Sequence, residues 1–172
     1  MLAEQSAGTA YEHGMQIGKS HTLIVRPATV KRPAASRHGQ QIIVRLPADK
    51  TLDTPDVVRV VRDSVIEALR VEAKSYLTKR LAYLARQHGF NYEKLRFSHA
   101  SGRWGSCSSS GTISLNIALM KLPFELIDYV LVHELSHTIQ MNHSSEFWAL
   151  VETADPQYKA HRRSLKNETP SI

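Results

Sequence analysis

The sequence predicts an α+β fold, a small domain in which a mixed or antiparallel sheet is combined with helices. Two observations predict this class. Two Ile- and Val-rich segments precede a long helical pattern, and two further strand-like segments precede a second group of helical patterns. Strands and helices segregated along the chain in this way are typical of α+β proteins. The length of 172 residues, 42% of them apolar, fits one compact domain.

The first part of the chain predicts a leader and two strands. Residues 1–18 are small, polar and aperiodic, so we expect a flexible leader. His21–Val30 and Gln40–Pro47 are rich in the β-branched side chains that favour strands. The connector between them, Lys31–Gly39, is basic and contains proline, which predicts an exposed loop.

A long helix is predicted next. Thr54 offers a hydroxyl cap, Pro55 suits the first helical position, and the carboxylate of Asp56 suits the positive end of the helix dipole. The apolar pattern continues to His88, and Gly89 ends it. A single rod over residues 55–88 would be about 51 Å long, which exceeds the size of a small domain, so we expect a bend or a break.

The second half repeats the order of strands followed by helices. Lys94–Ala100 and Gly111–Asn116 read as strands around a Gly- and Ser-rich loop. Pro123 opens a helix expected to end near Asn142, and Ser144 or Ser145 caps a helix that is followed by a basic tail. The predicted organisation is therefore a leader (1–18), one domain (19–166) built from an N-terminal strand pair (19–50) and a core (55–166), and a flexible tail (167–172).

Composition and charge restrict the classes of function. No apolar run approaches the roughly 18 residues that a membrane span needs, and the N-terminus lacks a signal-peptide pattern. The single cysteine, Cys107, excludes an intramolecular disulfide, and together these features predict a cytoplasmic protein. The net charge of +6 favours attraction to nucleic acid or nucleotides. No pattern indicates an oligomeric state.

The most specific signal is an HExxH motif, His133-Glu134-Leu135-Ser136-His137. On a helix, residues four apart lie on one face, so the imidazoles of His133 and His137 can bind one metal ion. Glu134, beside the first ligand, is placed to take a proton from a metal-bound water. With this composition about 0.03 such motifs are expected by chance, and the motif falls inside an independently predicted helix.

A third ligand is needed for a catalytic metal site with one open position. His143 is the favoured candidate, because a helix end near Asn142 would return it to the other two histidines. Glu146 and Glu152 on the following helix compete for this role. Three imidazoles suit Zn²⁺. Cys107 is either a fourth ligand, a redox-sensitive thiol or, as we favour, a small buried residue.

Three separated blocks, Arg103–Asn116, Leu122–His137 and Met141–Trp148, together resemble the YgjP-like family of small bacterial metallopeptidases. The pattern is also related to that of SprT-like and Wss-type zincin domains. The resemblance covers roughly residues 55–166. It implies a minimal, gluzincin-like zincin with zinc on the three histidines and Glu134 as the general base.

Two further residues are candidates for binding the substrate. In zincins an edge strand beside the metal binds an extended peptide, and Gly111–Asn116 is the candidate strand here. Asn116 is predicted either to hold a substrate amide or to cap the turn before Ala118. Arg103 is a candidate for stabilising an oxyanion, and its alternative is a surface residue stacked on Trp104.

Outside the motif, the carboxylates of Asp128 and Asp155 are candidates for orienting a ligating imidazole. Asp155 is the preferred candidate for this role. A carboxylate in this role would fix the ring by accepting its second N–H.

The sequence therefore predicts a zinc-dependent hydrolase, most simply a metallopeptidase that cleaves peptides or proteins by Glu134-assisted attack of zinc-bound water. Two alternatives stay open at this point. One is a zinc-dependent hydrolase of nucleotide phosphoanhydrides. The other is a nucleic-acid-binding module or a DNA-associated protease that uses the basic surface.

Overall fold

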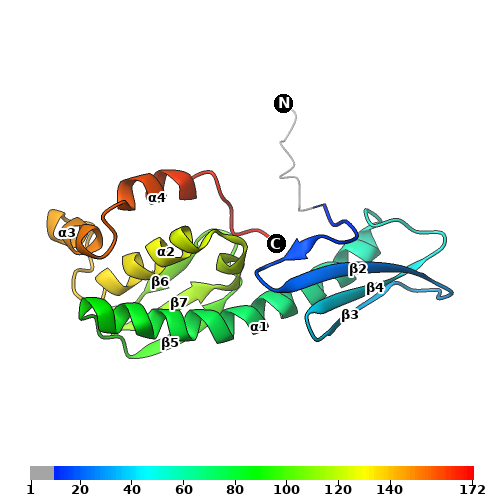
Figure 1. Ribbon diagram of the computed structural model, residues 1–172, viewed down its shortest axis with the longest axis horizontal. Coiled ribbons are helices and arrows are strands. Elements are labelled where there is room, and N and C mark those ends of the chain that lie inside the picture. Colours follow the sequence, from blue (N-terminus) through cyan, green and yellow to red (C-terminus); the bar gives the residue numbers. More distant parts are fainter. Residues whose placement is uncertain (1–9) are drawn as a thin grey trace. The chain divides into compact units, whose positions relative to one another are not determined.

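The computed structural model describes residues 10–172, which form four α-helices, a 3₁₀ helix and two mixed β-sheets (Figure 1). The α+β prediction is confirmed. Contacts among the described residues define two compact units: the described chain up to Leu69 together with 171–172, and residues 70–170. Among the described helices, none is both long and apolar enough to cross a membrane.

The first unit contains a four-stranded sheet in the order β1-β2-β4-β3. Its strands are β1 (Gln16–Ile17), β2 (His21–Ala28), β3 (Ala34–His38) and β4 (Gln41–Pro47). Strand β4 pairs parallel with β2 and antiparallel with β3. The connector predicted as a loop thus contains a strand, because a tight turn at Gly39, which has φ 59°, folds β3 back along β4.

Part of the predicted leader is also ordered. Residues 1–9 lie outside the described chain, but Tyr11 is buried and β1 pairs with β2. The N–H of Gly14 donates to the carbonyl oxygen of Leu23 at 2.7 Å. At the other end of the chain, Arg62 Nε donates to the Ile172 carbonyl oxygen at 2.9 Å.

Helix α1 (Pro55–His88) has the predicted bounds and contains no break over its 34 residues. The expectation of a break was wrong because the helix contributes to two cores rather than to one. Its first part contributes buried Val57, Val61 and Leu69 to the first unit, and its second part contributes Leu77 and Leu81 to the second.

The second unit combines a three-stranded sheet with the remaining helices. The sheet, in the order β5-β7-β6, consists of β5 (Lys94–Ser98), β6 (Gly105–Cys107) and β7 (Thr112–Asn116). The 3₁₀ helix η1 (Ile117–Lys121) follows, and then α2 (Phe124–Ser136), α3 (Ser145–Ala154) and α4 (Tyr158–Leu165). Helix α2 packs against α3, α4 and β6. The predicted basic tail is therefore largely helix α4.

Leu77 and Val71 offer a test of this packing on one helix. Leu77 is fully buried and Val71 is 42% exposed. Leu77→Ala should lower the free energy of unfolding of the second unit by about 2–5 kcal/mol, and Val71→Ala should change it by less than about 0.5 kcal/mol. Urea unfolding followed by tryptophan fluorescence measures this unit, because both tryptophans lie in it. Equal effects of the two substitutions would contradict the assigned core.

Candidate metal centre

Helix α2 carries the HExxH motif, and another face of the same helix packs in the hydrophobic core. Five apolar residues of the helix form that face and are all buried: Leu126, Ile127, Val130, Leu131 and Leu135. The packing of these side chains fixes the rotation of the helix, so that His133 and His137 lie together on another side of it, His133 partly exposed and His137 buried. Their ring centroids are 5.0 Å apart.

The helix ends at Ser136, six residues before the predicted end at Asn142. Beyond it the backbone tightens, since the N–H groups of Thr138 and Ile139 donate three residues back, to Leu135 and Ser136, at 3.0 and 3.1 Å. The Ser136 hydroxyl donates to the Val132 carbonyl oxygen at 2.7 Å. This early end leaves the residues after His137 free to turn back toward α2.

The turn brings His143 onto the other two histidines. The ligand atoms of His133, His137 and His143 all lie within 4.8 Å of one another, and the Nε2 atoms of His133 and His143 are 3.3 Å apart. Two nitrogens that bind one zinc ion at about 2.0–2.1 Å in tetrahedral geometry also lie about 3.3 Å apart. The cluster therefore brings together three donor atoms that could hold one metal ion.

Hydrogen bonding also prepares His137 for a metal. Its Nδ1 lies 3.0 Å from the Gln140 carbonyl oxygen, and a carbonyl can only accept, so Nδ1 carries the proton. The lone pair is then on Nε2, where a metal would bind. The tight turn after α2 thus both ends the helix and orients its last histidine.

Burial favours the neutral form of two of the imidazoles, those of His133 and His137. It lowers the pKa of His133 to about 3, with further lowering by the charges of His137, His143 and Arg162. The pKa of His137 is lowered as well, mainly by burial. Metal binding requires neutral imidazole, so these groups do not have to lose a proton at neutral pH.

Aromatic side chains from α3 pack around the cluster. The Ser144 hydroxyl caps α3 by accepting from the Phe147 N–H at 3.3 Å. The ring of fully buried Phe147 stacks on His137 with centroids 4.4 Å apart, and Trp148 stacks on His143 at 5.9 Å. These contacts hold two of the three imidazoles in place.

Glu134 is the acidic group of the site. It is 6% exposed, and burial raises its pKa to about 7, against a smaller lowering by the charge of Arg103. A Cβ added to Gly105 of β6 would lie 3.1 Å from the Glu134 Cγ and 3.1 Å from the Ser114 carbonyl oxygen. Glycine at this position therefore lets β6 lie directly against the carboxylate-bearing side chain.

The strand beside the site is β6, not the predicted Gly111–Asn116. That segment forms β7, which is paired on both sides, with β5 and with β6. A central strand has no free backbone groups for a peptide, whereas β6 is an edge strand and packs against α2. Strand β6 was not predicted from the sequence because it is three residues long and lies in the Gly- and Ser-rich segment.

The structure places Asn116 inside the protein. It is fully buried, its Nδ2 donates to the carbonyl oxygens of Ala100 and Arg103 at 2.6 and 3.0 Å, and its Oδ1 accepts from the Ala118 N–H at 2.9 Å. These contacts do not suit the predicted grip on a substrate amide. They hold the loop that carries Arg103, whose own side chain is exposed.

The competing ligands lie elsewhere. In residues 10–172 the metal-competent group contains the three histidines but neither Glu146, Glu152 nor Cys107. Glu146 is exposed and accepts a hydrogen bond from Ser145 Oγ at 3.3 Å. Burial, and secondarily the charge of Glu134, raises the pKa of the Cys107 thiol, which favours its neutral form.

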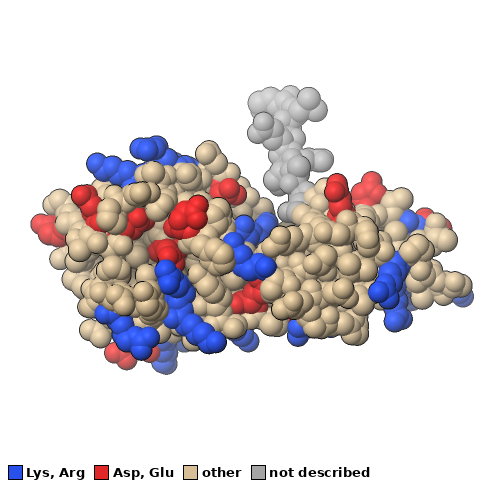
Figure 2. All heavy atoms as spheres, viewed as in Figure 1, with Lys and Arg blue, Asp and Glu red and all other residues tan. Residues whose placement is uncertain are grey.

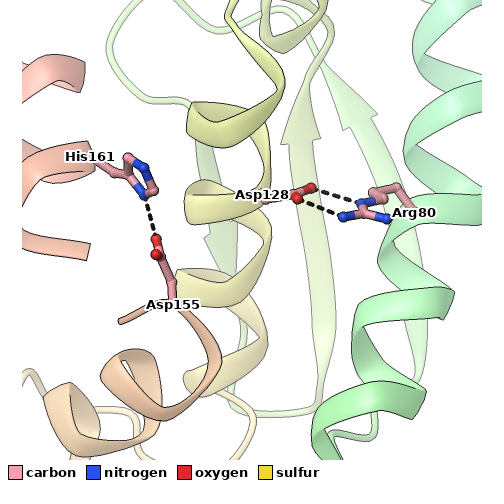
Figure 3. Close-up of polar contacts among 4 residues, drawn as sticks. All are labelled: Arg80, Asp128, Asp155 and His161. Carbon is pink, nitrogen blue, oxygen red and sulfur yellow. Dashed lines mark hydrogen bonds and ion pairs between the residues drawn. The ribbon is translucent and has the colours of Figure 1, made fainter. Parts of the chain in front are cut away.

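The two carboxylates predicted to orient an imidazole have other partners (Figure 3). Asp128 accepts two hydrogen bonds from Arg80 of α1, at 2.9 and 2.7 Å. Asp155 lies 2.7 Å from Nδ1 of His161, a histidine to which the sequence assigned no role. Neither carboxylate is paired with a histidine of the cluster, and the backbone carbonyl of Gln140 orients His137 instead.

Two solved structures resemble about half of the chain. The metallopeptidase zymogen abylysin of Pyrococcus abyssi is 28% identical, with a TM-score of 0.47 over 52% of this chain and 92% of that chain. The zymogen jannalysin of Methanocaldococcus jannaschii is 16% identical, with a TM-score of 0.46 over 52% of this chain and 93% of that chain. No curated protein matches.

The sequence model of one protein family covers almost the whole chain. It is described as the YgjP-like metallopeptidase domain, and it matches residues 3–168. That range includes both the helix with the HExxH motif and the turn that carries the third histidine. This metallohydrolase therefore belongs to the YgjP-like metallopeptidase family.

Proposed function

We propose that this protein is a zinc-dependent peptidase in which His133, His137 and His143 bind the metal and Glu134 is the general base. The observation that carries the proposal is the convergence of three imidazoles beside a buried carboxylate. A divalent ion held by such ligands lowers the pKa of water and polarises a carbonyl group. Membership of a metallopeptidase family supports a peptide as the substrate.

Glu134 would move the proton in this reaction. In its ionised form the carboxylate accepts a proton from the attacking water, and it then donates that proton to the nitrogen of the departing amine. A group that does both works best when its pKa lies near the working pH, and burial moves the pKa of Glu134 toward neutrality. The contact with β6 restricts where the carboxylate can lie.

Substrate would be held by β6 and Arg103. The outer edge of β6 offers backbone groups for an extended peptide beside Glu134. The charge of Arg103 is close enough to lower the pKa of Glu134, so a carbonyl oxygen that becomes negative during attack would lie within reach of that charge. We assign Asn116 a positioning role, because it fixes the loop before β6.

Replacing the proposed base should abolish turnover without removing the metal. We expect Glu134→Gln to lower kcat by about 100-fold or more, because the amide cannot accept the proton, and to leave the zinc content unchanged. Peptide hydrolysis and metal analysis by mass spectrometry measure the two effects. Glu152→Gln, an exposed change on α3, is the matched control. Full activity of Glu134→Gln would refute the mechanism.

The role of the third histidine can be tested by metal affinity. Loss of a hydrogen-bond partner of a metal ligand commonly weakens binding by about 10–100-fold, and loss of a ligand should cost more. We therefore expect His143→Ala to release zinc to a chelator far more readily than the wild type. His38→Ala, on β3 of the other unit, should behave as the wild type does. Unchanged zinc affinity of His143→Ala would exclude His143 as a ligand.

Gly105 provides a test of the contact between β6 and Glu134. Gly105→Ala places a methyl group against Glu134 and should lower kcat by roughly ten-fold or more, because small displacements of a catalytic group are costly. Gly102→Ala should leave kcat unchanged, because a Cβ added at Gly102 has no other atom within 4 Å. Zinc content and thermal unfolding confirm that both variants are folded. Unchanged kcat in a folded Gly105→Ala protein would show that the close contact is unimportant.

A further inference from the structure

Beside the metal centre lies a pocket that the proposed chemistry does not use. It has a volume of 280 Å³ and is lined by two aromatic and four cationic side chains, Trp148, Tyr158, Lys159, Arg162, Arg163 and Lys166. We call it the α4 pocket. No acidic residue lines it, and Figure 2 shows Lys and Arg side chains gathered where α4 lies in Figure 1.

The four cations of the α4 pocket repel one another. Lys159 lies three and four residues before Arg162 and Arg163 on α4, and Lys166 at the C-cap lies four and three residues after them, spacings at which like charges destabilise a helix. Within residues 10–172 none of them forms an ion pair with Asp or Glu. The helix dipole accounts for Arg162 and Arg163 in the last turn, but it opposes Lys159 in the first. A bound anion would relieve this repulsion.

One indole ring connects the α4 pocket to the metal ligands. Trp148 stacks on His143 with centroids 5.9 Å apart and on Tyr158 with centroids 5.4 Å apart. The guanidinium carbon of Arg162 lies 4.7 Å from the centroid of the Trp148 ring. The pocket is therefore next to the proposed reaction centre.

We propose that the α4 pocket is a specificity subsite that binds the carboxylate of an acidic side chain, Asp or Glu, of the peptide substrate. This inference rests on the proposed peptidase function. Arg and Lys donate charge-assisted hydrogen bonds to a carboxylate, and the rings of Trp148 and Tyr158 offer apolar surface for the methylene groups next to it. From the His143 ring it is 5.9 Å to the centroid of Trp148 and a further 4.7 Å to the Arg162 guanidinium carbon. An extended peptide advances about 3.3 Å per residue, so the acidic side chain would lie roughly two or three residues from the scissile bond.

The test compares binding of two labelled peptides that differ only in Glu against Gln, measured by fluorescence anisotropy on zinc-loaded Glu134→Gln protein. We expect the Glu peptide to bind about ten-fold more tightly, which corresponds to about 1.4 kcal/mol. Arg163→Glu in the same background should abolish or invert the preference. Lys79→Glu changes the net charge equally, on exposed α1 surface outside the pocket, and should preserve the preference.

Equal affinity for the two peptides, or a preference that Arg163→Glu leaves intact, would overturn the subsite. A preference lost equally in Lys79→Glu would overturn it as well, because the selectivity would then reflect overall charge. The hydrolysis assay on the wild type separates the two proposals. If no peptide is cleaved, the peptidase function fails, whereas cleavage without Glu preference rejects the subsite alone.

Discussion

The three-histidine cluster depends on where helix α2 ends. An α-helix that continued past Ser136 would carry the following residues away along its axis, and His143 would not reach the first two imidazoles. The chain instead tightens into a turn in which His137 Nδ1 donates to the Gln140 carbonyl oxygen. This hydrogen bond orients the ring of His137. It lies in the turn that ends α2 and reverses the backbone toward the metal position.

The packing of α3 side chains completes the site that the turn after α2 forms. Ser144 caps α3 directly after His143, and this start places Phe147 and Trp148 of the first turn against the imidazoles. The burial that these rings provide also explains the lowered pKa of His133. The site is therefore formed by three consecutive local features, which are a helix end, a turn and a helix cap. All three lie within one short stretch of the chain.

Much of the fold could be predicted where the sequence carries a long periodic signal. Helix α1 begins at Pro55 and ends at His88 as predicted, and Ser144, one of the two predicted caps, caps α3. The elements that were not predicted are short or polar. Strands β3 and β6 lie in connectors rich in turn-forming residues, and their pairing is decided by β4 and β7, to which they bond. Helix α4 has no buried residue, so no apolar stripe marks it.

The sequence by itself determined the donor types and their order: an HExxH motif on an apolar helix, followed by a third histidine. Only the tertiary structure decided which groups meet. It placed β6 rather than β7 at an edge of the sheet, because the order of the strands is set by pairing between residues that are distant in the sequence. It also paired Asp128 with Arg80 and Asp155 with His161. Such partners lie on different elements, and no local spacing encodes the distance between them.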